Sequence, residues 1–224
     1  MKGRAFGPAL FACRLRLRSR GYPSATVNNC DFGPLRIAYD ARVLEPRRWT
    51  RLQSDWAAEL SPLLPEGAIL ELCAGAGQIG LLAAVLTGRA LVQVDVDPAA
   101  GEFARANARR AGVTDYEMRV APLDAALHEH ERFPLILADP PYVRSAEVAA
   151  FPEDPVRAID GGEDGLTLIE NCVRVAEAHL CDRGVALLQV RGAAQANQLP
   201  NRALRVSEIR AVDEERAVVK LNRG

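Results

Sequence analysis

The sequence offers little that could build a metal centre or a disulfide framework. Its five cysteines are odd in number and include no CxxC pair, and its three histidines do not gather at one place. This cysteine usage fits free thiols in a reducing compartment better than a zinc site or a disulfide-stabilised secreted domain. We therefore expect a cytoplasmic protein without a bound metal.

Long apolar runs are also missing from the sequence. No stretch reaches the roughly 20 apolar residues that a membrane-spanning helix needs. The short run ALFAC near the N-terminus is followed by the basic sequence RLRLRSR, a combination that is not typical of a signal peptide. The sequence therefore predicts no association with a membrane.

Charge is nearly balanced over the whole chain but is unevenly distributed. Residues 1–51 contain eleven lysines and arginines against three acids, so they carry +8 and leave −9 for residues 52–224. A basic arm on an acidic body could meet RNA, an acidic protein surface or solvent. Residues 1–30 show no clear periodicity, and we expect them to form a mobile basic arm.

Residues 31–66 are expected to hold a hairpin and a helix that lead into a ligand cleft. Residues 32–44 alternate polar and apolar side chains, which suggests a small hairpin. Residues 50–64 have the apolar spacing of a helix, and Thr50 is a plausible N-cap.

Residues 67–224 alternate apolar, strand-like runs with helical stretches. Strands that alternate with helices form βαβ units, and therefore a parallel sheet covered on both faces. The tail breaks the alternation and predicts an antiparallel hairpin. The expected fold is thus α/β: a Rossmann-like, doubly wound, seven-stranded sheet, mostly parallel, with a C-terminal antiparallel hairpin. The expected strands are 68–72, 90–94, 116–120, 135–138, 185–190, 204–212 and 216–221, and the expected helices are 79–86, 99–111, 166–179 and a short one at 124–130.

Glycines stand between the first strand and the first helix of this region, in ILELCAGAGQIG (residues 69–80). Glycine allows a ligand to approach the backbone N–H groups near a helix N-terminus closely. The second strand ends in VQVDVD, where Asp95 is placed to accept both hydroxyls of a ribose. The two motifs together predict a nucleoside-binding edge of the sheet.

The nature of that nucleoside is open between three interpretations. The spacing Gly75-x-Gly77-x-x-Gly80 matches the dinucleotide fingerprint, which would indicate an NAD-dependent oxidoreductase. Glu71, however, stands inside the strand where a dinucleotide fold normally has an apolar residue. The sequence DPPY (residues 139–142), which follows a later strand, has no role in hydride transfer. A nucleoside with a cationic tail, S-adenosylmethionine, fits these features better, and a structural turn without a ligand is the third interpretation.

In their order along the chain, these motifs resemble those of class I S-adenosylmethionine-dependent methyltransferases. Within that class the chain resembles the HemK/PrmC family, which methylates the glutamine of a GGQ motif in peptide-chain release factors. Three stretches carry the resemblance, which runs from about Leu44 to Val190: VLEPRRWT (43–50), ADPPYV (138–143) and EDPVRAIDGGEDGL (153–166).

The resemblance implies S-adenosylmethionine as the cofactor and residues 67–224 as the methyltransferase domain. In this interpretation the Asp139 carboxylate and the Pro140 carbonyl each accept one N–H of a planar NH₂ group, and Tyr142 stacks on its plane. The catalytic residues implied are Asp139, Pro140, Pro141 and Tyr142. The cofactor-binding residues implied are Glu71, Cys73, Ala74, Gly75, Ala76, Gly77, Asp95, Val96, Leu123 and Asp124.

The chain also departs from the family pattern. Cys73 replaces the first glycine of the loop, and Pro122 and Leu123 replace an acid and an aromatic residue near the adenine. Asp139 stands where the glutamine methyltransferases have asparagine. The family's N-terminal helical domain, which is implied to recognise the release factor, has no counterpart of similar length in this chain.

The family stretches favour a protein substrate, such as the glutamine of a release factor. The alternative substrate is an exocyclic amino group of an RNA or DNA base. It is favoured by Asp139, by the basic arm and by the missing recognition domain. Nothing in the sequence indicates an oligomeric state.

Overall fold

The computed structural model describes residues 26–200 and 202–224, so most of the expected basic arm lies outside the described residues. A two-stranded antiparallel hairpin of β1 (Asn28–Phe32) and β2 (Leu35–Tyr39) comes first in the described part. This hairpin lies earlier than we expected, because its turn is formed by Gly33 and Pro34, where Gly33 supplies a φ of 60°. The alternation read over residues 32–44 therefore belongs mainly to the second strand and not to the whole hairpin.

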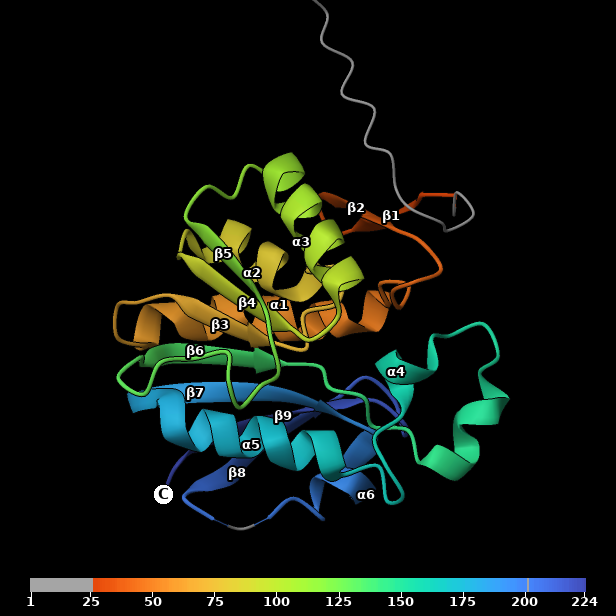
Figure 1. The fold of residues 1–224 in the computed structure, drawn as a ribbon. Coiled ribbons are helices and arrows are strands. Elements are labelled where there is room, and N and C mark those ends of the chain that lie inside the picture. Colours follow the sequence, from red (N-terminus) through yellow and green to blue (C-terminus); the bar gives the residue numbers. More distant parts are fainter. Residues whose placement is uncertain (1–25, 201) are drawn as a thin grey trace, which may run out of the picture.

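A seven-stranded sheet forms the centre of the molecule (Figure 1). Its strands are β3 (Ile69–Leu72), β4 (Leu91–Asp95), β5 (Tyr116–Val120), β6 (Phe133–Ala138), β7 (Leu180–Val190), β8 (Leu204–Ala211) and β9 (Ala217–Arg223). Their order is β5-β4-β3-β6-β7-β9-β8; the first five are parallel, and β9 runs antiparallel to both β7 and β8. The predicted fold class, including the C-terminal antiparallel hairpin, is confirmed.

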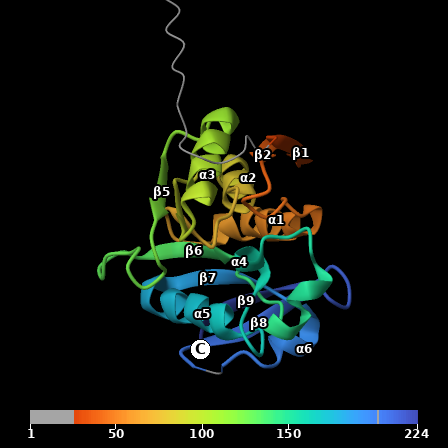
Figure 2. The ribbon, with the colours of Figure 1, turned by 45° about the vertical axis from the view of Figure 1, so that its right-hand side comes forward.

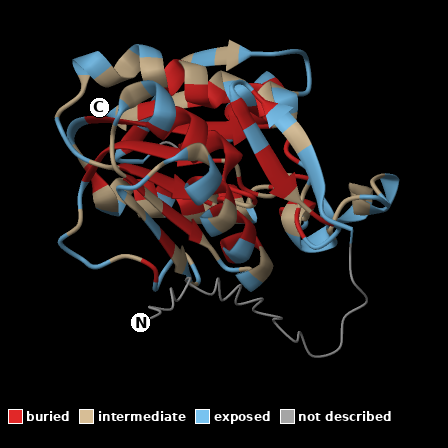
Figure 3. Ribbon diagram, turned by 90° about the horizontal axis from the view of Figure 1, so that it is seen from above, coloured by how far each residue is buried: buried red, intermediate tan, exposed pale blue. Residues whose placement is uncertain are grey.

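Helices cover both faces of the sheet (Figures 1 and 2). One face carries α1 (Arg51–Leu60), α2 (Gln78–Thr87), α3 (Pro98–Ala111) and the β1–β2 hairpin, and the other carries α5 (Thr167–His179) and α6 (Gly192–Ala196). Because helices pack against both faces of the sheet, β6 is buried along its whole length. Figure 3 shows this buried material in the middle of the molecule, with exposed residues on the outer helices and loops.

Alternation of side chains along β6 divides the apolar core in two. Leu135 and Leu137 pack with Trp56 of α1 on one face, whereas Ile136 and Ala138 pack with Ile169 of α5 on the other. A search of residues 26–200 and 202–224 for membrane-spanning helices finds none with the required length and apolar character.

The expected short helix at 124–130 is wrong, because this segment forms turns. Arg119 of β5 explains the difference: its guanidinium donates to the Ala126 carbonyl at 3.1 Å and to Glu131 at 2.8 Å. These bonds hold both ends of the segment to β5 in a turn conformation. Tertiary contacts thus override the local helical pattern.

Thr50 does precede α1, but its hydroxyl donates to the Arg47 carbonyl at 2.8 Å and does not cap the helix. The expected strand at 185–190 begins earlier, at Leu180. Two short helices were not expected, α6 and α4 (Val156–Ile159). Three 3₁₀ segments were not expected either: Arg48–Thr50, Ser61–Leu63 and Ser145–Ala150.

The strand order places a crevice at one edge of the sheet. The connections from β3 lead to β4 on one side, whereas β6 lies on the other side of β3. Ligands of open α/β sheets bind outside the carboxyl ends of the strands at such a switch point. Three segments with sequence motifs, at 73–77, 95–97 and 139–142, lie at the carboxyl ends of β3, β4 and β6 at this edge.

Candidate functional site

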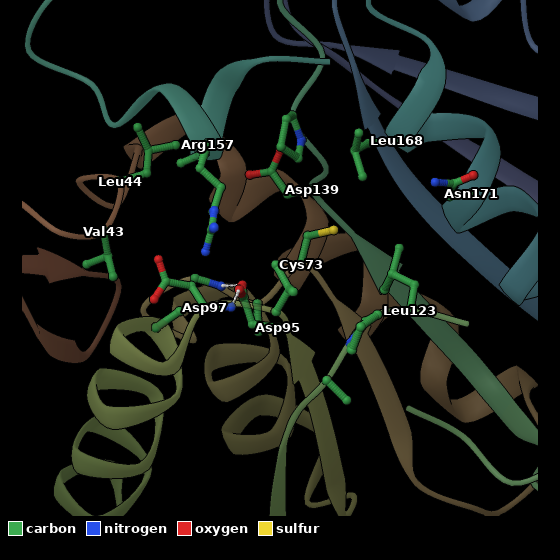
Figure 4. Close-up of a pocket in the computed structure, with 18 of the residues that line it drawn as sticks. Val43, Leu44, Cys73, Asp95, Asp97, Leu123, Asp139, Arg157, Leu168 and Asn171 are labelled. Carbon is green, nitrogen blue, oxygen red and sulfur yellow. Dashed lines mark hydrogen bonds between the residues drawn. The ribbon is translucent and has the colours of Figure 1, made fainter. Parts of the chain in front are cut away.

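A cavity of about 890 Å³ opens at the C-terminal edge of β3, β4 and β6. Its volume lies within the usual range for pockets that bind small molecules and cofactors. Figure 4 shows side chains from these strand ends, from the α4 segment and from α5 around the same space. Ten of the fourteen expected site residues line it: Cys73, Ala74, Gly75, Ala76, Asp95, Val96, Leu123, Asp124, Asp139 and Pro141.

The glycine loop turns sharply between β3 and α2. Cys73, Gly75 and Gly77 have φ values of 57°, 54° and 88°, all in the left-handed region. A Cβ on Gly77 would lie 3.1 Å from the side-chain amide of Gln93, so the close packing there requires glycine. Cys73 adopts this conformation although it has a Cβ, and its Sγ lies 3.9 Å from the Sγ of Cys172 in α5.

Glu71 lies beneath this loop and not in the cavity wall, where we expected it. Glu71 is 2% exposed, and its carboxylate accepts a hydrogen bond from the Gln93 amide. Burial raises the pKa of Glu71 to about 8. Gln93 also donates to the Gly77 carbonyl at 3.0 Å, so Glu71 is connected to the end of the glycine loop through Gln93.

Asp95 joins the end of β4 to the glycine loop. Its two carboxylate oxygens accept the backbone N–H groups of Gly75 and Asp97, each at 2.8 Å (Figure 4). Burial raises the pKa of Asp95, and these two N–H groups oppose that rise. A carboxylate oxygen can accept more than one hydrogen bond, so Asp95 keeps acceptor capacity for a ligand. Apolar side chains of Val96 and Leu123 line the same cavity.

The carboxylate of Asp139 points into the cavity from the end of β6 (Figure 4). Among residues 26–200 and 202–224 no group donates a hydrogen bond to it. Burial alone raises the pKa of Asp139 to about 7. Asp139 is half-buried and lines the cavity, so its oxygens are accessible to a ligand that donates hydrogen bonds.

The backbone around Asp139 is held by two glutamines from different helices. Gln53 of α1 donates to the carbonyl of Ala138 at 2.7 Å, one residue before the carboxylate. Gln195 of α6 donates to the carbonyl of Tyr142 at 3.2 Å, on the other side of the two prolines. Helices on both faces of the sheet therefore fix this turn.

Glycines of the 161–165 loop support the same turn from below. A Cβ on Gly161 would lie 2.8 Å from the Pro141 carbonyl oxygen and 2.8 Å from Cα of Tyr142. The backbone N–H of Gly161 also donates to the Val143 carbonyl at 2.8 Å. The glycines of this loop are required for close backbone packing against the DPPY segment.

Pro140, Tyr142, Glu71 and Gly77 are the expected site residues that do not line the cavity. The two glutamines that hold the DPPY turn were not expected at all. One of them did leave a signal in the sequence, because Gln53 shares a helix face with Trp56 and Ala57, both fully buried. A polar residue on an apolar helix face needs a buried partner.

The described part of the chain contains no group of three His, Cys, Asp or Glu residues arranged to hold a metal ion. The cavity suits a nucleoside with a positively charged tail. Asp95 can accept ribose hydroxyls, Val96 and Leu123 can flank a base, and Asp139 favours a nearby cation.

A family model described as the methyltransferase small domain matches residues 56–153. The release factor glutamine methyltransferase of Mycolicibacterium smegmatis is 32% identical over 163 residues, 70% of this chain and 57% of the relative. The ribosomal protein uL3 glutamine methyltransferase of Bordetella pertussis is 32% identical over 166 residues, 69% of this chain and 54% of the relative. The chain thus spans just over half the length of these relatives.

Solved methyltransferase structures share the fold. The ribosomal protein L11 methylase of Lactobacillus delbrueckii subsp. bulgaricus superposes with a TM-score of 0.61 at 13% identity, covering 82% of this chain and 83% of that one. The hMettl16 catalytic domain, in complex with the MAT2A 3'UTR hairpin 1, gives 0.65 at 17% identity, covering 85% and 75%. These identities speak for the fold alone.

The sheet order, the family match and the curated relatives agree with one another. The chain contains a methyltransferase small domain with the fold of class I methyltransferases, and its sequence is similar to the HemK/PrmC-like glutamine methyltransferases.

Proposed function

We propose that this protein transfers a methyl group from S-adenosylmethionine to a planar NH₂ nitrogen, and that its substrate is the side-chain amide of a protein glutamine. The observation that carries the proposal is the Asp139 carboxylate, which faces the cavity and receives no hydrogen bond from the described residues. An NH₂ group supplies the donor that this acceptor lacks.

The cofactor would lie across the ends of β3 and β4. Asp95 would accept the ribose hydroxyls, and Val96 and Leu123 would flank the adenine. The backbone of residues 73–77 would border the amino-acid tail. When bound, S-adenosylmethionine supplies an electrophilic methyl group on a positively charged sulfur.

The substrate amide would be oriented by the DPPY turn. An amide nitrogen is a poor nucleophile because its lone pair is delocalised, so its orientation decides the rate. Asp139 and the Pro140 carbonyl would each accept one N–H, and the ring of Tyr142 would pack on the amide plane. As positive charge develops on the nitrogen, the fixed anion beside it stabilises the transition state more than the ground state.

Charge around the turn supports a polypeptide as the substrate. Three arginines lie near enough to Tyr142 to lower its pKa, against the larger effect of burial: Arg216, Arg47 and Arg191. Each is paired with a carboxylate, as in the ion pairs Arg216–Asp213, Arg47–Asp154 and Arg191–Glu147. Recognition of a nucleic acid relies on lysines and arginines that are free to neutralise phosphates. The named relatives, which are glutamine methyltransferases of proteins, point the same way.

A nucleic-acid base remains the second candidate substrate, on one specific observation. Asp139 is a carboxylate where the resembled family has an amide, and an exocyclic amino group can donate to it equally well. The structural neighbour bound to an RNA hairpin shares only the fold, and so adds no weight to this candidate.

Replacement of Asp95 tests the cofactor. We expect Asp95→Ala to weaken binding of S-adenosylhomocysteine by about 10- to 100-fold, because hydrogen bonds to a charged acceptor are lost. Asp115→Ala removes the same charge from an exposed position outside the cavity and should leave the affinity unchanged. Calorimetry with S-adenosylhomocysteine and NAD measures both. Tight binding of NAD without binding of S-adenosylhomocysteine would contradict the proposal.

Transfer of tritiated methyl groups into a total cell lysate tests the substrate class. We expect label that protease digestion releases and nuclease digestion does not. Asp139→Ala should lower incorporation by about 10²–10³, since one acceptor beside developing charge is lost. Asp139→Asn should retain more activity, because it keeps a carbonyl acceptor. Label that resists protease but not nuclease would favour the nucleic-acid base, and an alanine variant with full activity would refute the role of Asp139.

The pKa of Asp139, raised to about 7, predicts a pH dependence. The kcat/KM should rise as pH increases through about 7, because the ionised carboxylate is the better acceptor, and Asp139→Asn should lack this step. The free energy of unfolding should change with pH in the opposite direction. The folded state binds the extra proton between about pH 4 and 7, so the wild type loses stability relative to Asp139→Asn as pH rises through that window. Urea unfolding at several pH values measures the difference; a constant difference would contradict the raised pKa.

A further inference from the structure

Arg157 extends from α4 into the cavity. Figure 4 shows its guanidinium pointing into the space that Asp95 and Asp97 face from the end of β4. It stands in the stretch at 153–166 that resembles the glutamine methyltransferases, but it is not among the residues to which that resemblance assigns a role. A role for this arginine therefore belongs to this chain and does not follow from the family motif.

The other basic side chains of the cavity wall already have partners. Arg42 is paired with Asp40 and Glu102. Arg174 donates to Asn171, and His179 contacts the Glu131 carbonyl. Within residues 26–200 and 202–224 the structure gives Arg157 neither an ion pair nor a hydrogen bond. It is thus the cavity arginine that remains available to a ligand.

The segment that carries Arg157 is fixed at both ends. On one side Arg47 pairs with Asp154 at 2.5 Å, immediately before Pro155 and α4. On the other side the Asp160 carboxylate accepts the hydroxyl of Ser145 at 2.7 Å and a backbone N–H at 2.9 Å. A short helix held in this way places its arginine over the cavity before a ligand arrives, which lowers the entropic cost of binding.

Among the charged residues of the wall, carboxylates outnumber arginines. Its carboxylates are Asp95, Asp97, Asp124, Asp139 and Asp160. Such a wall favours the positive groups of an amino-acid tail but repels its carboxylate. A guanidinium offsets that repulsion, because its planar fork of donors matches a carboxylate with two parallel hydrogen bonds.

We propose that Arg157 binds the carboxylate of the cofactor's methionine moiety and makes the site specific for a nucleoside with an intact amino-acid tail. The inference rests on S-adenosylmethionine as the cofactor of the proposed function. It makes Arg157 a specificity-determining residue for the ligand and gives it no part in the chemistry at the acceptor nitrogen.

Two ligands that differ only in the carboxylate test this inference by calorimetry. They are S-adenosylhomocysteine and its decarboxylated analogue, which keeps the amino group. We expect the wild type to prefer S-adenosylhomocysteine. Arg157→Ala and Arg157→Gln should lower the affinity for S-adenosylhomocysteine by about tenfold or more and leave the affinity for the analogue unchanged. The reason is that hydrogen bonds between charged groups are lost for one ligand only. Arg157→Lys should restore part of the preference, because it keeps the charge without the fork.

Arg174→Ala is the matched control. This variant removes an arginine of the same cavity wall, one that is already bonded to Asn171. It should change the affinities for the two ligands by the same factor. If the Arg157 variants lower the affinities for both ligands equally, or lower neither affinity, the inference is overturned while the proposed function stands. If the wild type binds neither ligand, the proposed function fails, and this inference fails with it.

Discussion

A carboxylate held at the end of a buried strand, without a donor in the described structure, is the constraint around which this site is organised. Asp139 lies where the chain leaves β6, and partial burial raises its pKa to about 7. The turn that carries this carboxylate is fixed by Gln53, by Gln195 and by the close approach of Gly161. A turn fixed from three elements presents its acceptor at one position, which is what orientation of a weak nucleophile requires.

The cofactor side of the cavity depends on a second buried acid. Glu71 accepts a hydrogen bond from Gln93, which also donates to the carbonyl of Gly77 at 3.0 Å. Asp95 then ties the same loop to the end of β4. The two acids thus have different roles. Glu71 is buried and supports the loop, whereas Asp95 contacts both the loop and the space that a ligand would fill. Asn107 of α3 adds a further bond, to the loop carbonyl of Ala76 at 2.9 Å.

The sequence was sufficient for the sheet and for the edge that carries the site, because apolar strand runs and the motifs that follow them are local features. It was not sufficient for contacts made across layers. The direction of Glu71 could not be deduced, since a strand buried on both faces has no polar side toward which an acid would turn. The turns at 124–130 follow from Arg119, a residue of β5 whose side-chain direction no local pattern reveals. Gln195 belongs to a five-residue helix that periodicity cannot detect.

The central claim is that the methyl group arrives on an amide nitrogen, and the fate of that nitrogen in acid tests it most directly. Complete acid hydrolysis of protein labelled by the enzyme breaks the amide C–N bond, and an N-methylated glutamine then yields glutamate and volatile methylamine. We predict that the tritium distils as methylamine after the hydrolysate is made alkaline. Label that stays with a non-volatile amino acid or a nucleobase would contradict the account.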